Sequence, residues 1–125
     1  MAKETKGKRA TAWRKDGGQP EIEDGILLLQ AEADGTVYTE NGRVFSTGVT
    51  LEIPKGCAAL LTGDPTLNWE RNCCAAAEVL RGCSEIRVKL YNHGRNYVDI
   101  RKGELIARVV FAHGPIECKE LESAD

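Results

Sequence analysis

Three segments of the chain carry the hydrophobic and polar alternation that is typical of half-buried β-strands. Residues 44–56 alternate up to a Pro-Lys-Gly turn, and residues 85–94 alternate up to an Asn-His-Gly turn. Residues 100–111 contain a tight turn followed by an apolar strand. Alternate side chains of a strand share one face, and Pro and Gly favour the turns that end it. The positions predicted to face a core are Val49, Leu51, Ile53, Ile86, Val88 and Leu90.

Four further segments complete the predicted elements. Residues 25–31 are a continuous apolar run suited to a buried strand, and residues 36–39 form a short strand between two turn signals. Residues 57–62 predict another strand. Residues 69–81 are rich in alanine, which favours a short helix, although a division into helix and strand stays open. Many short strands separated by turns predict an all-β sandwich or barrel.

The two ends of the chain differ from the middle in composition. Residues 1–20 are basic and contain glycine, which predicts a flexible arm. The arm could be a solvated tail, contact nucleic acid or lie across a neighbouring subunit. Residues 115–125 predict an acidic tail. The folded domain is therefore expected over residues 21–114.

Composition and charge narrow the function classes. The chain has 125 residues and a formal net charge of −2, which argues against nucleic acid as a partner. No apolar run approaches the roughly 18 residues that a membrane span requires. The basic start lacks a following apolar stretch, so we expect an intracellular protein, cytoplasmic or nuclear, rather than a secreted one.

The cysteines predict reduced thiols rather than a disulfide framework, because their number is odd and two of them are adjacent. Their spacing also lacks the paired ligands of a zinc site, so no metal site is predicted. Cys83 with His93, or Cys57 with His113, could form a nucleophile and base, but nothing in the sequence brings them together. The five cysteines are Cys57, Cys73, Cys74, Cys83 and Cys118.

The order of the strands resembles the dUTPase family of trimeric β-barrel nucleotide hydrolases. The family strand Ser-Thr-Gly-Val-x-Val-x-Ile-Pro-x-Gly is matched by residues 46–56. The family strand Glu-Ile-x-Val-x-Leu-x-Asn is matched by residues 85–92, and its Gly-Asp-Arg-Ile-Ala-Gln-Leu-Val strand by residues 103–110. The resemblance implies a jelly-roll-like, distorted β-barrel that assembles as a homotrimer with active sites shared between subunits.

Several site positions of the family hold other residues here. In the first motif, Ala-Gly-Tyr-Asp-Leu, Thr36 stands at the Asp position, and the nearest acid is Asp34. In the phosphate-binding motif Arg-Ser-Gly, the corresponding residues are Asp64, Pro65 and Thr66. An acid in place of Arg reverses the charge that a phosphate would meet, and Pro65 removes a backbone donor.

Of the three remaining family motifs, one is largely kept and two are not. At the water-activating Asp of the third motif stands Val79, with Glu78 beside it, and Gly82 takes the place of the Tyr. The fourth motif is largely kept over residues 103–108 and ends in Arg108. The Gly-rich closing arm of the fifth motif has no counterpart. These sites are interpreted as vestigial nucleotide or phosphate positions.

The residues therefore predict a non-catalytic dUTPase-like protein, a pseudoenzyme without a cofactor, that acts as a protein-interaction or regulatory module. A viral accessory role is an expectation from the resemblance. One alternative is an active dUTP pyrophosphatase with a shifted site, using Mg²⁺ and the acids Asp34, Asp64 or Glu78. A second is a structural or assembly β-module.

Candidates for binding an unidentified protein partner are one aromatic residue and several cations. Trp69 is expected either in the core, the preferred interpretation, or as an exposed anchor. Arg87, Lys89 and Arg101, with other nearby cations, could cluster on adjoining strands. A solvated sheet face is the default interpretation of such a cluster, and a patch for an acidic partner or nucleic acid is the alternative.

Overall fold

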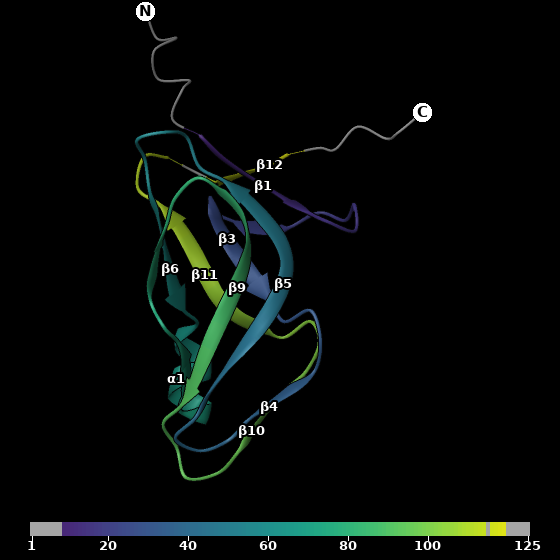
Figure 1. Cartoon of the computed structure of the whole chain (residues 1–125), viewed down its shortest axis with the longest axis vertical. Coiled ribbons are helices and arrows are strands. Elements are labelled where there is room, and N and C mark those ends of the chain that lie inside the picture. The colour runs from purple at the N-terminus through teal and green to yellow at the C-terminus, as the bar shows by residue number, and fades with distance from the viewer. Residues whose placement is uncertain (1–8, 115, 120–125) are drawn as a thin grey trace, which may run out of the picture.

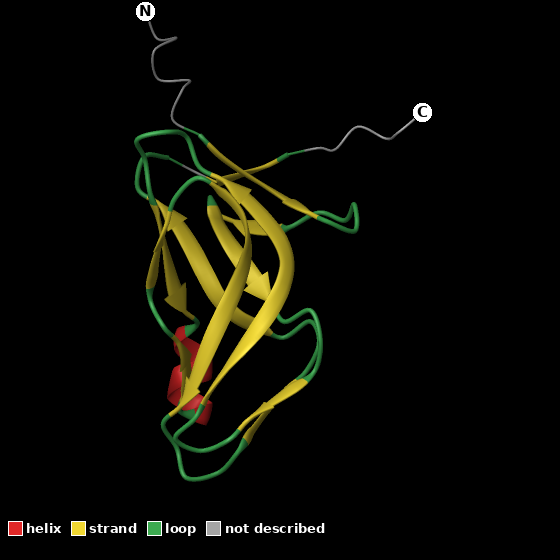
Figure 2. Ribbon diagram, viewed as in Figure 1, coloured by secondary structure: helices red, strands yellow, loops and turns green. Residues whose placement is uncertain are grey.

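The computed structural model describes residues 9–114 and 116–119, which form a β-rich fold with a single short helix (Figures 1 and 2). The all-β class predicted from the alternation is confirmed. The strands are β1 (Ala10–Arg14), β2 (Glu21–Glu23), β3 (Ile26–Gln30), β4 (Gly35–Val37), β5 (Gly42–Glu52), β6 (Ala59–Gly63), β7 (Cys73–Ala75), β8 (Glu78–Leu80), β9 (Cys83–Asn92), β10 (Val98–Ile100), β11 (Leu105–Phe111) and β12 (Ile116–Cys118), and the helix is α1 (Pro65–Arg71). No helix among these residues is long and apolar enough to cross a membrane.

Two five-stranded sheets and a two-stranded ribbon make up the fold. One sheet has the order β12-β1-β5-β9-β7, and the other has the order β2-β3-β11-β6-β8. The ribbon pairs β4 with β10. Figure 1 places this ribbon and α1 at one end of the molecule and β1 and β12 at the other. The long strands β5 and β9 run between the two ends.

The core lies between the sheets and uses the predicted faces of the long strands. All six predicted positions of β5, β9 and the residue after β5 are buried: Val49, Leu51, Ile53, Ile86, Val88 and Leu90. The second sheet contributes Leu27, Leu29, Leu61 and Val109, each at most 1% exposed. Burial of such side chains contributes about 1.5–3 kcal/mol each to folding.

A bulge in β5 explains the Ser-Thr-Gly sequence at its centre. The register between β5 and β9 shifts between Ser46 and Thr50. The buried Thr47 hydroxyl donates to the backbone oxygen of Ile86 at 2.7 Å, and Gly48 adopts a φ of +72°. A residue with a side chain is strained at that φ. These three residues therefore turn the strand without leaving a buried polar group unpaired.

The helix lies earlier in the chain than the alanines suggested. Asp64 caps α1 by accepting from the Leu67 backbone N–H, and Pro65 is the first helical residue. The helix ends at Arg71, where Asn72 adopts the left-handed conformation. A helix through the rest of residues 69–81 is wrong, because residues 73–75 and 78–80 form β7 and β8. Pairing with β9 and β6 overrides the helical preference of alanine there.

The prediction of a flexible arm and a tail at the two ends of the domain is wrong for the residues that form β1 and β12. β1 pairs antiparallel with β5, and β12 pairs parallel with β1. Ala10 and Ala12 are fully buried in β1, and Ile116 is buried in β12. The buried side chains of β1 are small and lie between Arg9 and Arg14, so the strand pattern was weak there. Residues 1–8, 115 and 120–125 of the predicted arm and tail lie outside the described residues.

Candidate functional site

The positions of the phosphate-binding motif lie at the start of α1. Asp64 is only 6% exposed, and its two carboxylate oxygens have separate partners. Oδ2 accepts from the Leu67 backbone N–H at 3.1 Å, and Oδ1 pairs with Nη2 of Arg108 at 3.3 Å. No local sequence pattern connects Asp64 with Arg108, because 44 positions separate them. The carboxylate is thus committed to the fold.

A cavity of about 240 Å³ beside the helix is lined by Asp64, Thr66, Glu70, Arg71 and Glu104, among others. Its charged lining residues comprise three carboxylates and one guanidinium. The guanidinium donates to the Glu104 carboxylate and to a backbone oxygen of the ribbon. Carboxylates facing the same space repel an anionic ligand. The charged lining of the cavity is therefore predominantly acidic.

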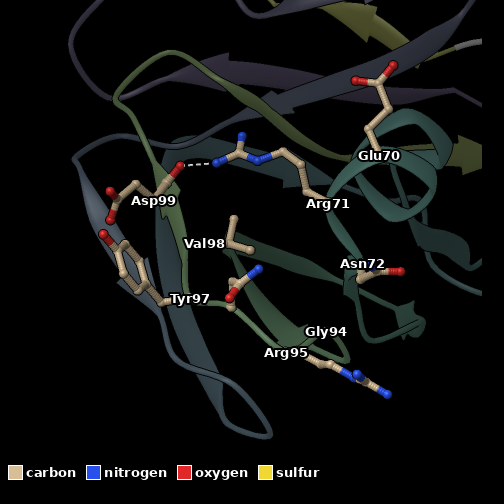
Figure 3. Close-up of a pocket in the computed structure, with 9 residues that line it drawn as sticks. Glu70, Arg71, Asn72, Gly94, Arg95, Tyr97, Val98 and Asp99 are labelled. Carbon is tan, nitrogen blue, oxygen red and sulfur yellow. Dashed lines mark hydrogen bonds between the residues drawn. The ribbon is translucent and has the colours of Figure 1, made fainter.

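A second cavity, of about 340 Å³, lies between the end of α1 and the loop that leads into β10. Figure 3 shows Arg71 reaching from the helix to the backbone oxygen of Asp99, and Tyr97 lying beside Asp99. Tyr97 is 62% exposed, and its ring centre lies 6.4 Å from that of Tyr38 on the facing loop. Tyr97 is thus the one aromatic side chain among the described residues that line this recess.

Asp34 and Thr36 serve the ribbon end of the fold. The Thr36 hydroxyl donates to Asp99 at 2.7 Å, across the β4–β10 pair. Asp34 accepts from the Lys102 backbone N–H at 2.7 Å and so holds the turn between β10 and β11. Both residues line a groove of about 270 Å³ with Asp99. Neither Asp64 nor Glu78 lines this groove.

The third-motif positions lie on and after β8. Glu78 and Val79 are both exposed, and Val79 pairs in register with Leu60 of β6. Gly82 turns the chain into β9 with a φ of +73°, and its backbone oxygen accepts from the Ile53 N–H at 2.8 Å. The structure therefore places Asp34, Asp64 and Glu78 on three separate elements and does not bring these acids into one pocket.

The partner-binding candidates are distributed over several elements. Trp69 is 83% exposed on α1, so the preferred interpretation of a core residue is wrong. Arg87 and Lys89 both lie on the exposed face of β9, two residues apart. Arg101 lies in the turn between β10 and β11 and is not on an adjoining strand. Only Arg87 and Lys89 of the predicted cluster are thus brought onto one strand face.

The structure pairs a thiol and an imidazole that the sequence left apart. Sγ of Cys74 lies 3.5 Å from Nε2 of His93. Among the described residues, His93 is hydrogen-bonded to Cys74 and not to Cys83, the pair considered from the sequence. The signal was the register of β7 with β9, which aligns Cys73 with Asn92. That register brings the next residue of each strand together diagonally, within reach of a long side chain.

The adjacent cysteine has the opposite environment. Cys73 is fully buried, and burial raises the pKa of its thiol from 9.0 to about 11, aided by the neighbouring Cys74. Arg71 opposes this pKa shift. Within the described residues, no group of three or more His, Cys, Asp or Glu side chains is placed to hold a metal ion.

Comparison with known proteins places the fold. The sequence profile of the dUTPase family matches residues 20–125. A variant of the Staphylococcus bacteriophage 80alpha dUTPase bound to dUpNHpp is 17% identical, with a TM-score of 0.73, and 93% of this chain aligns with 96% of that one. The dUTPase of phage phi11 of S. aureus, a variant solved for its structural Mg(II) ion, has the same TM-score and coverage at 14% identity. The native EIAV dUTPase is 15% identical, with a TM-score of 0.70 and the same coverage.

Curated proteins give no significant match to the chain. The family profile nevertheless spans most of the sequence, and the solved structures agree with it in fold over nearly the whole length. The predicted family is thereby confirmed. The chain belongs to the dUTPase family.

Proposed function

We propose that this chain is a non-catalytic member of the dUTPase family that acts as a protein-interaction or regulatory module. The observation that carries the proposal is that a carboxylate at the start of α1 is paired within the chain. The family's phosphate-binding Arg is replaced by Asp64, whose oxygens cap the helix and pair with Arg108. A triphosphate at this position would meet a buried carboxylate and would have to break that pair.

The remaining phosphate and water positions support the same proposal. Thr36 is bonded to the β10 strand, and Val79 offers no group that could orient a water molecule. The acids that might replace the lost Asp lie on separate elements. General base catalysis requires an acid within hydrogen-bond reach of the attacking water and of the substrate. We therefore expect neither hydrolysis nor tight binding of dUTP.

A regulatory role is supported by the relatives and by the surface. The Staphylococcus bacteriophage 80alpha dUTPase is described as controlling transfer of virulence genes by a proto-oncogenic G protein-like mechanism. This chain exposes Trp69 on α1, and tryptophan is among the residues that most often anchor protein interfaces. The recess beside Tyr97 is lined by Glu70 and Arg71, the last two residues of the same helix. We propose this end of the molecule, around α1 and the β10 loop, as the partner surface.

Two measurements test the absence of catalysis. Pyrophosphate release from dUTP in the presence of Mg²⁺ should not exceed the rate without protein, and titration calorimetry with dUpNHpp should show no binding in the micromolar range. An active relative measured beside it serves as the positive control. Turnover that the substitution Glu78→Ala or Asp34→Ala abolishes would overturn the proposal.

One observation favours an active dUTP pyrophosphatase as the second candidate. The Nε of Arg108 is buried and has no hydrogen-bond partner within the described part of the chain. Such a group could donate to an anionic ligand if Asp64 turned away. Mg²⁺-dependent turnover that is lost in Arg108→Gln but kept in Glu78→Ala would select this candidate.

We further propose that the chain assembles as a homotrimer, as the family resemblance implies. Support comes from an apolar row on the outer face of the second sheet, where Val110, Leu60 and Val79 are directly opposite one another on β11, β6 and β8. Each is more than 40% exposed in the single chain. Sedimentation should show one discrete trimer. Open-ended assembly would instead favour the structural module.

A further inference from the structure

The strands β7 and β9 hold a thiol beside an imidazole on the surface of the molecule. Cys74 is in register with Tyr91, and His93 follows two residues later, directly after the end of β9. The Cys74 Sγ and the His93 Nε2 are 3.5 Å apart. The His93 backbone N–H donates to the oxygen of Asn72 at 2.8 Å, which fixes the two strands at this point. The pair is therefore preformed by the sheet.

The four other thiols differ in how far they are exposed. Cys57 and Cys73 are buried, whereas Cys83 and Cys118 are exposed. The Cys118 thiol donates to the backbone oxygen of Lys119, and among the described residues neither exposed thiol has a histidine as a hydrogen-bond partner. Thiolates rather than thiols are the nucleophiles of cysteine chemistry, and a nearby base increases their supply.

We propose that Cys74 is the reactive thiol of this chain and forms mixed disulfides with small disulfides such as glutathione disulfide, with His93 as its proton acceptor. The proposal is independent of whether the chain hydrolyses nucleotides, because it uses none of the residues of the phosphate motifs. It assigns a modification site on the edge strand β7.

The charged and titratable groups around the pair come from three elements. On β9, the ring of Tyr91 lies beside Cys74, and the Lys89 ammonium stands 5.1 Å above that ring. At the end of α1, Arg71 acts on the neighbouring Cys73. The end of β6 also approaches, since a Cβ at Gly63 would lie 3.6 Å from that of Cys74.

The reaction balances without a further reactant. The proton of the Cys74 thiol moves to Nε2 of His93, and the thiolate attacks one sulfur of the small disulfide. The bond between Cys74 and that sulfur forms as the original S–S bond breaks. The departing thiolate takes the proton back from His93. A second small thiol reverses the modification by the same route.

The test compares five thiols within one protein. The full chain is treated with glutathione disulfide, sampled over time and digested, and each cysteine is followed by mass spectrometry, with fragmentation to separate Cys73 from Cys74. We expect Cys74 to be modified faster than Cys83 and Cys118. His93→Gln should slow it at least about ten-fold, as loss of a positioned base does. His113→Gln is the matched control, because that imidazole contacts the Phe111 ring instead.

The same samples separate a chemical role of His93 from a structural one. If His93 only holds the strands together, its loss loosens β7, and the buried Cys73 becomes modified faster. If His93 accepts the proton, Cys74 slows and Cys73 stays protected. Equal rates for Cys74 and the two exposed thiols, or an unchanged Cys74 rate in His93→Gln, would overturn the proposal. Should His93→Gln unfold, His93→Asn is measured in its place with the same expected result.

Discussion

The middle of the barrel and the end that begins at α1 use their side chains in different ways. In the middle, β5 and β9 bury alternate apolar residues, and the few polar groups, such as Thr47, are paired with backbone. At the α1 end, charged side chains are paired with each other: Asp64 with Arg108, and Arg71 with Glu104. The strands that resemble the family are thus those whose residues are buried in the core. At the α1 end, the charged groups stabilise this chain itself.

The comparison teaches that charged groups at one end of a fold can be paired within the chain itself. Removing an Arg from a phosphate site normally leaves unsatisfied groups, because the remaining donors no longer have a ligand. In this chain, Asp64 both caps the helix and pairs with Arg108. The predictions that follow test whether the two ends differ as described.

The largest expected effect is in the middle of the barrel. Leu90→Ala removes a fully buried side chain of β9 and should lower the free energy of unfolding by about 2–5 kcal/mol. Val44→Ala, on the paired strand but 52% exposed, is the control and should change the free energy of unfolding by less than about 0.5 kcal/mol. Urea unfolding followed by circular dichroism measures both. Equal effects would mean that the core is not where the structure places it.

The next effect concerns the pair at the start of α1. Asp64→Ala removes the helix cap and leaves Arg108 without its carboxylate, so we expect a loss of about 2 kcal/mol in the free energy of unfolding. Asp64→Asn keeps a capping oxygen and loses only the ion pair, which should cost about 1 kcal/mol or less because Arg108 is partly exposed.

The ranking of these two variants is the informative result. If Asp64→Asn destabilises as much as Asp64→Ala, the ion pair outweighs the cap. If neither variant is destabilised, the carboxylate is not committed to the fold, and the argument against phosphate at this end weakens. The same urea titration applies to both proteins.

Local signals in the sequence predicted the frame, but contacts between distant residues made the site. Period-two alternation ending in Pro or Gly identified β5, β9 and β11, because each signal lies within one strand. The pair Asp64–Arg108 joins α1 to β11 and depends on how the sheet closes, for which no local pattern exists. Strand β1 was missed because Ala10 and Ala12 are small and stand among basic residues.

The helix shows where a better use of local signals would have helped. Asp64 followed by Pro65 is a start signal for a helix, and Leu67 two residues later is buried. Residues two apart in a helix lie on nearly opposite sides, so Trp69 had to face away from Leu67. Placing the helix at residues 65–71 would therefore have predicted an exposed tryptophan. The alanines at residues 75–77 drew the prediction further along the chain.

The buried thiol of Cys73 predicts a loss of stability in alkaline solution. Its pKa is about 11 in the folded chain against 9.0 for an ordinary thiol, so the unfolded chain loses this proton first as the pH rises. Below pH 9 the buried thiol makes its full contribution to the free energy of unfolding. Between pH 9 and about pH 11 this contribution falls by about 2 kcal/mol. The difference in the free energy of unfolding between the wild-type protein and Cys73→Ala should therefore shrink from pH 9 to about pH 11.

Denaturant titrations of both proteins at about pH 8 and about pH 11 measure the difference. Other groups titrate in the same interval, but they are common to the two proteins and cancel. A difference that stays constant with pH would mean that Cys73 is not held in the apolar environment that the structure gives it.

The smallest expected effect is at Trp69, and it separates a partner surface from a structural one. Because this side chain is 83% exposed, Trp69→Ala should change the free energy of unfolding by less than about 0.5 kcal/mol. Leu67→Ala, in the same helix but 3% exposed, should cost about 2 kcal/mol or more. A large exposed tryptophan that contributes nothing to folding is available to contact another molecule. A loss above about 1 kcal/mol in Trp69→Ala would instead show that the indole packs against its own chain or its own trimer, and would remove it from the proposed partner surface.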